Sequence, residues 1–277
     1  MLPLPDSPAP KFEERDYIVA YLDVLGTRFK NRNEDAVLRA KRLTELKDFV
    51  SSTAEFSPGG GLFAIIPVIV EIATAMSGAP AWSQRRANQF SDSILISVPA
   101  EGDLTRVLGL TTSVLMQIFH FGLSHGLPLR GAVSYGPAVF AEGVAVGDSV
   151  YEAVEWEQLA EWSGVLFAPS AGLLVDAAWK AGKPIDSIPY SAPLKTGYQA
   201  LSTNCPVLSW PMAGPANLVP ILKSRLLGAP MPLDAAVRLS NTIQFAEYVR
   251  NRSDLTSSYP QTTGMSSIVE TIWEKSM

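Results

Sequence analysis

The sequence predicts an α/β fold in which helices pack, mostly on one face, against one mainly antiparallel sheet. Two observations support this prediction. Between residues 17 and 182, helical patterns alternate with short β-branched and aromatic runs, several of which come in pairs. The composition, 47% hydrophobic and 18% charged over 277 residues, is sufficient to bury a large core.

The first half of the chain begins with a proline-rich leader over residues 1–14. A buried strand is expected over Tyr17–Leu22, ending at Asp23, because the apolar run YIVAYL stops there. Further elements are expected in chain order: an amphipathic helix over 34–50, an apolar helix over 62–76 inside a loop and helix insertion (57–87), a hairpin over 88–99 with its turn near Asp92, and a helix over 104–123.

In the second half, LRGAVSYGPAVF (129–140) reads as a hairpin split at Gly136-Pro137. A helix entered through Gly147-Asp148 (147–162), a strand (165–170) and a helix ended by Gly182 follow. This order predicts a ferredoxin-like core over residues 15–190. Residues 191–277 are expected to form a C-terminal extension packed on that core, with an edge strand over 203–212, helices over 217–227 and 233–250, and a short last helix.

Charge and rare residues exclude several functions. A net charge of −5 supplies no general field for binding a nucleic-acid backbone or an anionic membrane surface. Cys205 is the single cysteine, and His120 and His125 are the two histidines, so a disulfide framework and a Cys/His zinc cluster are excluded. The leader lacks the pattern of a secretory signal, and the apolar 62–76 stretch is too short to span a bilayer. We therefore expect a cytoplasmic protein without membrane insertion.

Asp23 and Asp92 stand at predicted strand ends, which neighbouring strands of one sheet could bring together. Paired carboxylates beside a glycine-containing turn suit Mg²⁺ or Mn²⁺ bound with substrate phosphates. The alternative is that each aspartate caps a turn, which is the simpler interpretation for Asp92 taken alone. Arg130, at the start of a predicted strand, could clamp a triphosphate or form a surface salt bridge, and both interpretations stay open.

Four segments taken in order resemble the signature segments of class III nucleotidyl cyclases. They are YLDVLGTRF (21–29), FSDSILIS (90–97), LPLRGAVSYGPAVF (127–140) and GVAVGDSVYEAVEWEQ (143–158). The resemblance implies a cyclase core with two Mg²⁺ or Mn²⁺ ions held by Asp23, the Val24 carbonyl and Asp92. It also implies a nucleoside triphosphate substrate and a homodimer with shared sites, in which one chain supplies the metal residues and the other supplies residues 144–155. Arg130 and the turn formed by Val24, Leu25, Gly26, Thr27 and Arg28 are the implied phosphate contacts.

Several positions differ from the family pattern. Tyr151 and Glu155 stand where the family carries an asparagine and an arginine, so Arg28, Arg85 and Arg86 are candidate replacement cations, and Tyr151 is retained as a candidate catalytic residue. The strand motif is Arg-Gly-Ala rather than Arg-x-Gly. Asn88 and Val144 occupy the two base-selecting positions without either purine-reading pair, and an asparagine amide fits a pyrimidine edge.

This pattern is similar to the stand-alone pyrimidine cyclases of bacterial anti-phage systems. The resemblance implies an enzyme that converts UTP, or CTP, into the 3′,5′-cyclic monophosphate and pyrophosphate, an antiviral second messenger that a separate effector reads. Two alternatives stay open: a catalytically degenerate module that binds nucleotide, and a purine cyclase with an atypical base pocket.

Overall fold

The computed structural model describes residues 13–25, 36–54, 86–90, 93–141, 144–227, 232–252, 254–259 and 265–276. The strands are β1 (Glu14–Val24), β2 (Arg86–Phe90), β3 (Ser93–Pro99), β4 (Leu129–Ala141), β5 (Val144–Val146), β6 (Val165–Phe167), β7 (Ser187–Tyr190) and β8 (Cys205–Leu208). The helices are α1 (Ala36–Ala54), α3 (Leu104–Ser124), α4 (Asp148–Leu159), α5 (Pro169–Lys180), α6 (Leu218–Leu227), α7 (Leu233–Arg250), α8 (Asp254–Ser258) and α9 (Met265–Ser276), with short 3-10 helices η3 (Gln199–Ser202) and η4 (Trp210–Met212).

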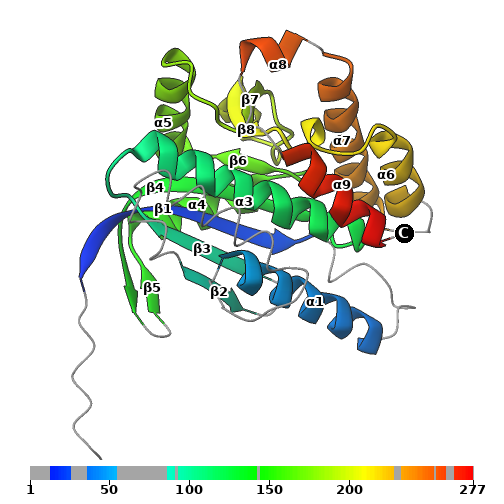
Figure 1. The fold of residues 1–277 in the computed structure, drawn as a ribbon, viewed down its shortest axis with the longest axis horizontal. Helices are drawn as coiled ribbons and strands as arrows, with labels where there is room; N and C mark the ends of the chain where they lie inside the picture. Colours follow the sequence, from blue (N-terminus) through cyan, green and yellow to red (C-terminus); the bar gives the residue numbers. More distant parts are fainter. Residues whose placement is uncertain are drawn as a thin grey trace, which may run out of the picture.

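The described strands form one eight-stranded sheet in the order β2-β3-β1-β4-β6-β8-β7, with β5 paired to β4 (Figure 1). The strand β1 runs antiparallel to both of its neighbours, β3 and β4, whereas β4 and β6 are parallel. The chain order β1-α1-β2-β3-α3-β4 is that of the ferredoxin-like unit. The predicted fold class, a mainly antiparallel sheet with helices packed on it, is therefore confirmed.

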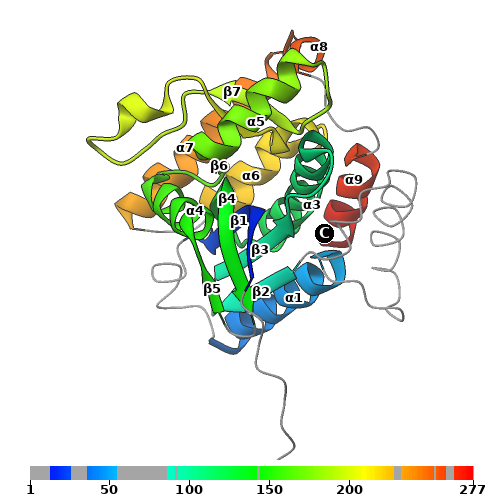
Figure 2. The ribbon, with the colours of Figure 1, turned by 90° about the vertical axis from the view of Figure 1, so that its left-hand side faces the viewer.

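The two faces of the sheet are covered unequally. Ile18, Ala20 and Leu22 of β1 lie in the large core, to which α1 and α3 also contribute. Val19, which points to the opposite face, lies in a smaller cluster with Val150 of α4, because successive strand residues alternate between faces. Figure 2 shows α4 on one side of the central strands and α1 and α3 on the other.

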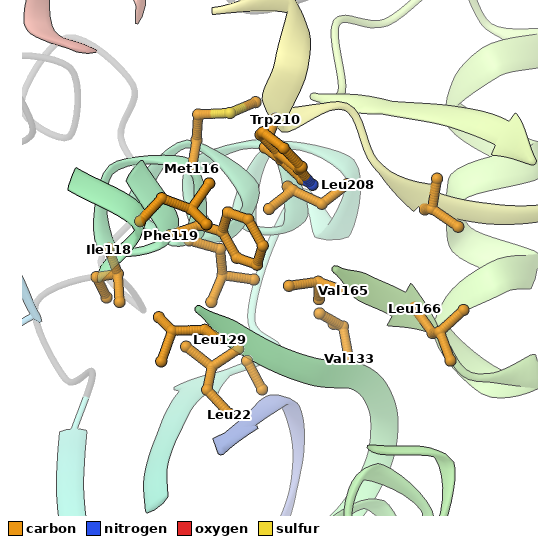
Figure 3. Close-up of a cluster of buried hydrophobic side chains, with 14 of the residues drawn as sticks. Leu22, Met116, Ile118, Phe119, Leu129, Val133, Val165, Leu166, Leu208 and Trp210 are labelled. Carbon is orange, nitrogen blue, oxygen red and sulfur yellow. The ribbon is translucent and has the colours of Figure 1, made fainter. Parts of the chain in front are cut away.

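The large core is centred on α3. This helix is long and apolar enough to cross a membrane, but 89% of its most apolar 18 residues are buried inside the fold, as expected for a core helix. Figure 3 shows Phe119 of α3 among side chains from several strands and from Trp210 of η4. The apolar helix expected over 62–76 lies outside the described residues.

The prediction of a hairpin with its turn at Gly136-Pro137 is wrong. The strand β4 continues through both residues and pairs with β1 as far as Val139. The Pro137 carbonyl accepts a hydrogen bond from Ser149 Oγ at 3.3 Å, which places the backbone polar groups of Pro137 on the side away from β1. The missing N–H of the proline therefore costs no hydrogen bond to β1. The hairpin is formed instead by β4 and β5.

Residues beyond 190 contribute to the same sheet. The predicted edge strand is β8, but it lies between β6 and β7, so that β7 is the edge. The helix α9 packs on α3, where buried His120 accepts a hydrogen bond from Trp273 Nε1 at 3.1 Å and its Nε2 lies 2.8 Å from the Trp210 carbonyl. The division of the chain at residue 190 stays a prediction.

Candidate functional site

Asp23 lies near the end of β1, beside the start of each of two neighbouring strands. Its Cα partners in the sheet are Ser93 of β3 and Arg130 of β4. Ser93 Oγ donates to Asp23 Oδ1 at 3.2 Å, and Arg130 Nη2 lies 3.5 Å from Asp23 Oδ2. Because the Asp23 side chain keeps 24% of its surface exposed, this carboxylate is accessible to a ligand from solvent.

The guanidinium of Arg130 contacts three groups. Its Nε is in direct contact with Glu157 Oε1 of α4 as an ion pair, its Nη1 donates to the Ala160 carbonyl at 3.4 Å, and its Nη2 faces Asp23. Only 16% of the Arg130 side chain is exposed. Arg130 forms a salt bridge, but a largely buried one rather than the surface salt bridge expected from sequence. A contact with a triphosphate stays a prediction.

Glu157 is a buried acid on the face of α4 that packs against the sheet, with 3% of its side chain exposed. Burial raises the pKa of its carboxyl to about 7, although the positive charge of Arg130 acts in the opposite direction. Asp23 raises the same pKa further, whereas Lys195 lowers it, so the four side chains form one electrostatically coupled group. We call Asp23, Arg130 and Glu157 the carboxylate–arginine cluster.

The donor chemistry of this cluster suits a hard divalent cation. Asp23 supplies accessible carboxylate oxygens, and residue 92, the second predicted carboxylate, immediately precedes the Ser93 that pairs with Asp23. Mg²⁺ commonly binds through one or two carboxylates together with substrate phosphates and water. Within the described ranges, no group of three or more His, Cys, Asp and Glu side chains could hold a metal ion.

Several predicted site residues lie outside the described part of the chain: Gly26, Thr27, Arg28, Arg85 and Asp92. Asn88 and Arg86 are described only as backbone positions of β2, where Asn88 pairs with Leu95. Val24 and Leu25 are buried at the end of β1, and the Leu25 N–H already donates to the Pro128 carbonyl at 2.7 Å. That N–H is therefore not available to a phosphate in this conformation.

The structure does not bring Val144 and Tyr151 to the carboxylate–arginine cluster of the same chain. Val144 pairs with Ala141, which stands 11 residues along β4 from Arg130, or about 36 Å in an extended strand. Tyr151 is on α4 but six residues before Glu157, about 9 Å along the helix and on a different face. Tyr151 is 56% exposed, so it is not part of the buried core.

These distant residues are exposed to solvent. Val144 and Val146 are 39% and 41% exposed on one face of β5, and the exposed ring of Tyr151 follows on α4. We call these three residues the β5–α4 patch. Glu155, one helical turn after Tyr151, is also exposed and lies on the solvated face of α4.

Sequence reasoning missed Glu157 and Ser93 as members of the site. The spacing of Val150, Val154 and Glu157 placed an acid on the predicted apolar stripe of the 147–162 helix. A charged residue on a buried stripe must find a partner of opposite charge, and this was the signal available for Glu157. Ser93 carried no comparable signal, since a serine beside a turn is common.

The fold and this cluster define an α/β protein with an accessible carboxylate and an arginine at the end of its central strand. No protein-family model and no curated protein matches the sequence. Among solved structures, the chain is similar to a bacterial light-regulated adenylyl cyclase, with 11% identity and a TM-score of 0.43, covering 87% of this chain and 58% of that one. It is also similar to the guanylyl cyclase Cya2, with 12% identity and a TM-score of 0.35, covering 60% of this chain and 80% of that one.

Proposed function

We propose that this protein is a nucleotidyl cyclase that converts a pyrimidine nucleoside triphosphate, UTP in preference to CTP, into its 3′,5′-cyclic monophosphate and pyrophosphate. The observation that carries the proposal is the placement of Asp23 and Arg130 at one register position of neighbouring strands, beside the Ser93 that follows Asp92. The described parts of the first three cyclase-like segments lie on the neighbouring strands β3, β1 and β4. The proposed product is an antiviral second messenger read by a separate effector.

In the proposed reaction, the ribose 3′-oxygen forms a bond to the α-phosphorus while the bond from that phosphorus to the bridging oxygen of pyrophosphate breaks. The 3′-hydroxyl proton leaves to solvent or to pyrophosphate. Asp23, the Val24 carbonyl and Asp92 are the residues proposed to hold Mg²⁺ or Mn²⁺. When bound, two such ions supply positive charge that lowers the pKa of the 3′-hydroxyl and stabilises the leaving group. Arg130 orients the triphosphate by pairing with its oxygens.

A homodimer is part of the proposal, because the predicted site residues stand at two separate places on one chain. Arg130 lies at the start of β4, whereas Val144 pairs with Ala141 at its other end and Tyr151 is exposed on α4. A second copy could place its patch beside Asp23, so that the base and ribose are bound by one chain and the phosphates by the other. Cyclic two-fold symmetry would then produce two equivalent sites.

Turnover tests the activity directly. Purified protein is incubated with Mn²⁺ and each of the four nucleoside triphosphates, and cyclic products are separated by chromatography. We expect cyclic UMP as the main product and loss of activity in Asp23→Asn and in Asp92→Asn. Cyclic AMP or cyclic GMP as the main product would reject the pyrimidine assignment, and full turnover by either variant would reject the metal assignment.

Complementation tests the shared site. Asp23→Asn and Tyr151→Ala chains are each expected to be inactive, but a mixture refolded together contains mixed dimers with one intact site. Because half of the dimers in an equal mixture are mixed and each has one intact site of two, about a quarter of wild-type activity should return. A mixture as inactive as its components would contradict the shared site.

One observation favours a second candidate, a nucleotide-binding module without turnover. Arg130 is occupied by Asp23 and Glu157 rather than free to meet a triphosphate, and Glu155 cannot stabilise phosphoryl charge as an arginine does. This candidate predicts saturable binding of UTP in calorimetry together with no cyclic product from any of the four nucleotides.

A further inference from the structure

We propose that Glu157 is a positioning residue that anchors Arg130 through Nε and thereby presents its two terminal nitrogens to the phosphates of the substrate beside Asp23. This inference rests on the proposed function, because it assigns the phosphate contact of that site. The family-like segments gave Glu157 no role. Its assignment comes from the contacts of the buried side chain.

The contacts of Arg130 are of two kinds. One holds the side chain in place, and the others can be exchanged for a ligand. The Nε–Glu157 ion pair is direct, whereas Nη1 and Nη2 reach the Ala160 carbonyl and Asp23 at 3.4 and 3.5 Å, the outer limit of hydrogen bonding. A guanidinium has five donors in a rigid fork, so an ion pair at Nε holds the group in place while the terminal nitrogens change partners. Phosphate oxygens are strong partners for that fork.

Asp23 has two competing uses in this arrangement. Its carboxylate is one of the groups paired with Arg130, and it is also the proposed cation ligand. A cation on Asp23 weakens the attraction between Asp23 and Arg130, since it neutralises the carboxylate. Glu157 then holds the arginine in place, and the released Nη2 is directed toward the bound phosphates.

The burial of the Glu157 carboxylate is energetically unfavourable and therefore requires an explanation. A carboxylate with 3% of its side chain exposed pays a large desolvation penalty, and its single close charged partner among the described residues is Arg130. Attachment of α4 to the sheet does not require that pair, because Val150 and Ala153 already pack the helix against β1 and β4. The acid therefore fits a role in placing the arginine better than a role in holding the helix.

The direction in which Glu157→Gln changes the affinity for an anion distinguishes a positioning role from a purely electrostatic effect of the Glu157 charge. Glu157→Gln removes a negative charge near the site, so electrostatics alone would tighten the binding of an anion. Loss of the anchor would weaken it. We expect inorganic tripolyphosphate, titrated with excess Mg²⁺ in a calorimeter, to bind the variant at least about tenfold more weakly than the wild type. Equal or tighter binding would overturn the proposal.

A double-mutant cycle shows whether Glu157 acts through Arg130. Tripolyphosphate affinity and kcat/KM are measured for Glu157→Gln, Arg130→Gln and the double variant. If Glu157 acts only through the arginine, its replacement causes no further loss of affinity in the Arg130→Gln background. Equal losses in both backgrounds would overturn the proposal. Glu152→Gln, which removes a carboxylate from the same helix where it contacts Ser170, is the matched control and should bind tripolyphosphate as the wild type does.

The wild-type chain provides a measurement that does not depend on a variant folding. In protein labelled with ¹⁵N-arginine, Arg130→Lys identifies the Arg130 Nε–H signal. That hydrogen should exchange at least about tenfold more slowly than those of exposed arginines, both without ligand and with Mg²⁺ and tripolyphosphate. Fast exchange in either state would overturn the anchor. If no nucleotide is turned over, the cyclase proposal fails by itself, while tripolyphosphate binding and exchange still decide the role of Glu157.

Discussion

Replacing Glu157 with glutamine should change how the stability of the protein depends on pH. Burial raises the pKa of this carboxyl from an ordinary 4.5 to about 7 in the folded state. At pH values between about 4.5 and 7, the folded protein binds more protons at Glu157 than the unfolded chain does. The contribution of Glu157 to the free energy of unfolding is therefore fully present below about pH 4.5 and is lost as the pH rises through 7.

The magnitude follows from the difference between the two pKa values. A rise from 4.5 to about 7 corresponds to about 3 kcal/mol, since each pKa unit is worth about 1.4 kcal/mol. Glutamine cannot ionise, so Glu157→Gln lacks this pH-dependent part. The destabilisation caused by the variant should be about 2–3 kcal/mol larger near pH 5 than near pH 8.

Urea unfolding of wild type and Glu157→Gln near pH 5 and near pH 8 measures this difference. Comparing the two proteins is necessary because His120 acts in the opposite direction: its pKa is lowered to about 4, so its contribution is lost as the pH falls. That contribution cancels in the difference between the two proteins. A difference that stays constant between the two pH values would refute the reasoning, because Glu157 would then titrate alike in the folded and unfolded states.

Three further predictions concern other parts of the molecule. Burial keeps His120 neutral in the fold, so stability should fall as the pH drops from about 6.5 to 4, and urea unfolding of His120→Gln should show a flatter acid limb, which an unchanged slope would contradict. Gly147 has a φ of 135°, and a Cβ there would lie 2.5 Å from Ala138 Cα, so Gly147→Ala should lose about 2 kcal/mol or more in urea unfolding. Gly172→Ala, in helix α5 with its nearest atoms at 3.9 Å, is the control and should be neutral or stabilising. Asp23→Asn should lose turnover while its unfolding free energy changes by less than about 1 kcal/mol, because the ion pair between Asp23 and Arg130 is partly exposed and its atoms are far apart. Global unfolding of this variant would show that the Asp23 side chain has a structural role instead.

Local patterns in the sequence determined the strand that carries Asp23 near its end, the strand that follows Asp92 and the core helix α3. In each case apolar spacing or an abrupt change from apolar to polar residues defines the element without reference to distant residues. The ferredoxin-like order could be predicted for the same reason. The turn expected at Gly136-Pro137 was wrong because a proline whose backbone faces away from the neighbouring strand leaves a sheet intact, and only the pairing partner decides this.

Only the tertiary structure decided how the site residues are grouped. The pairing register places Asp23 opposite Arg130, and the packing of α4 places Glu157 against the same arginine. The same register places Val144 at the far end of β4. Apolar periodicity indicates which face of an element is buried, but contacts between elements depend on sheet register and helix placement, which are set by interactions distributed over the whole chain.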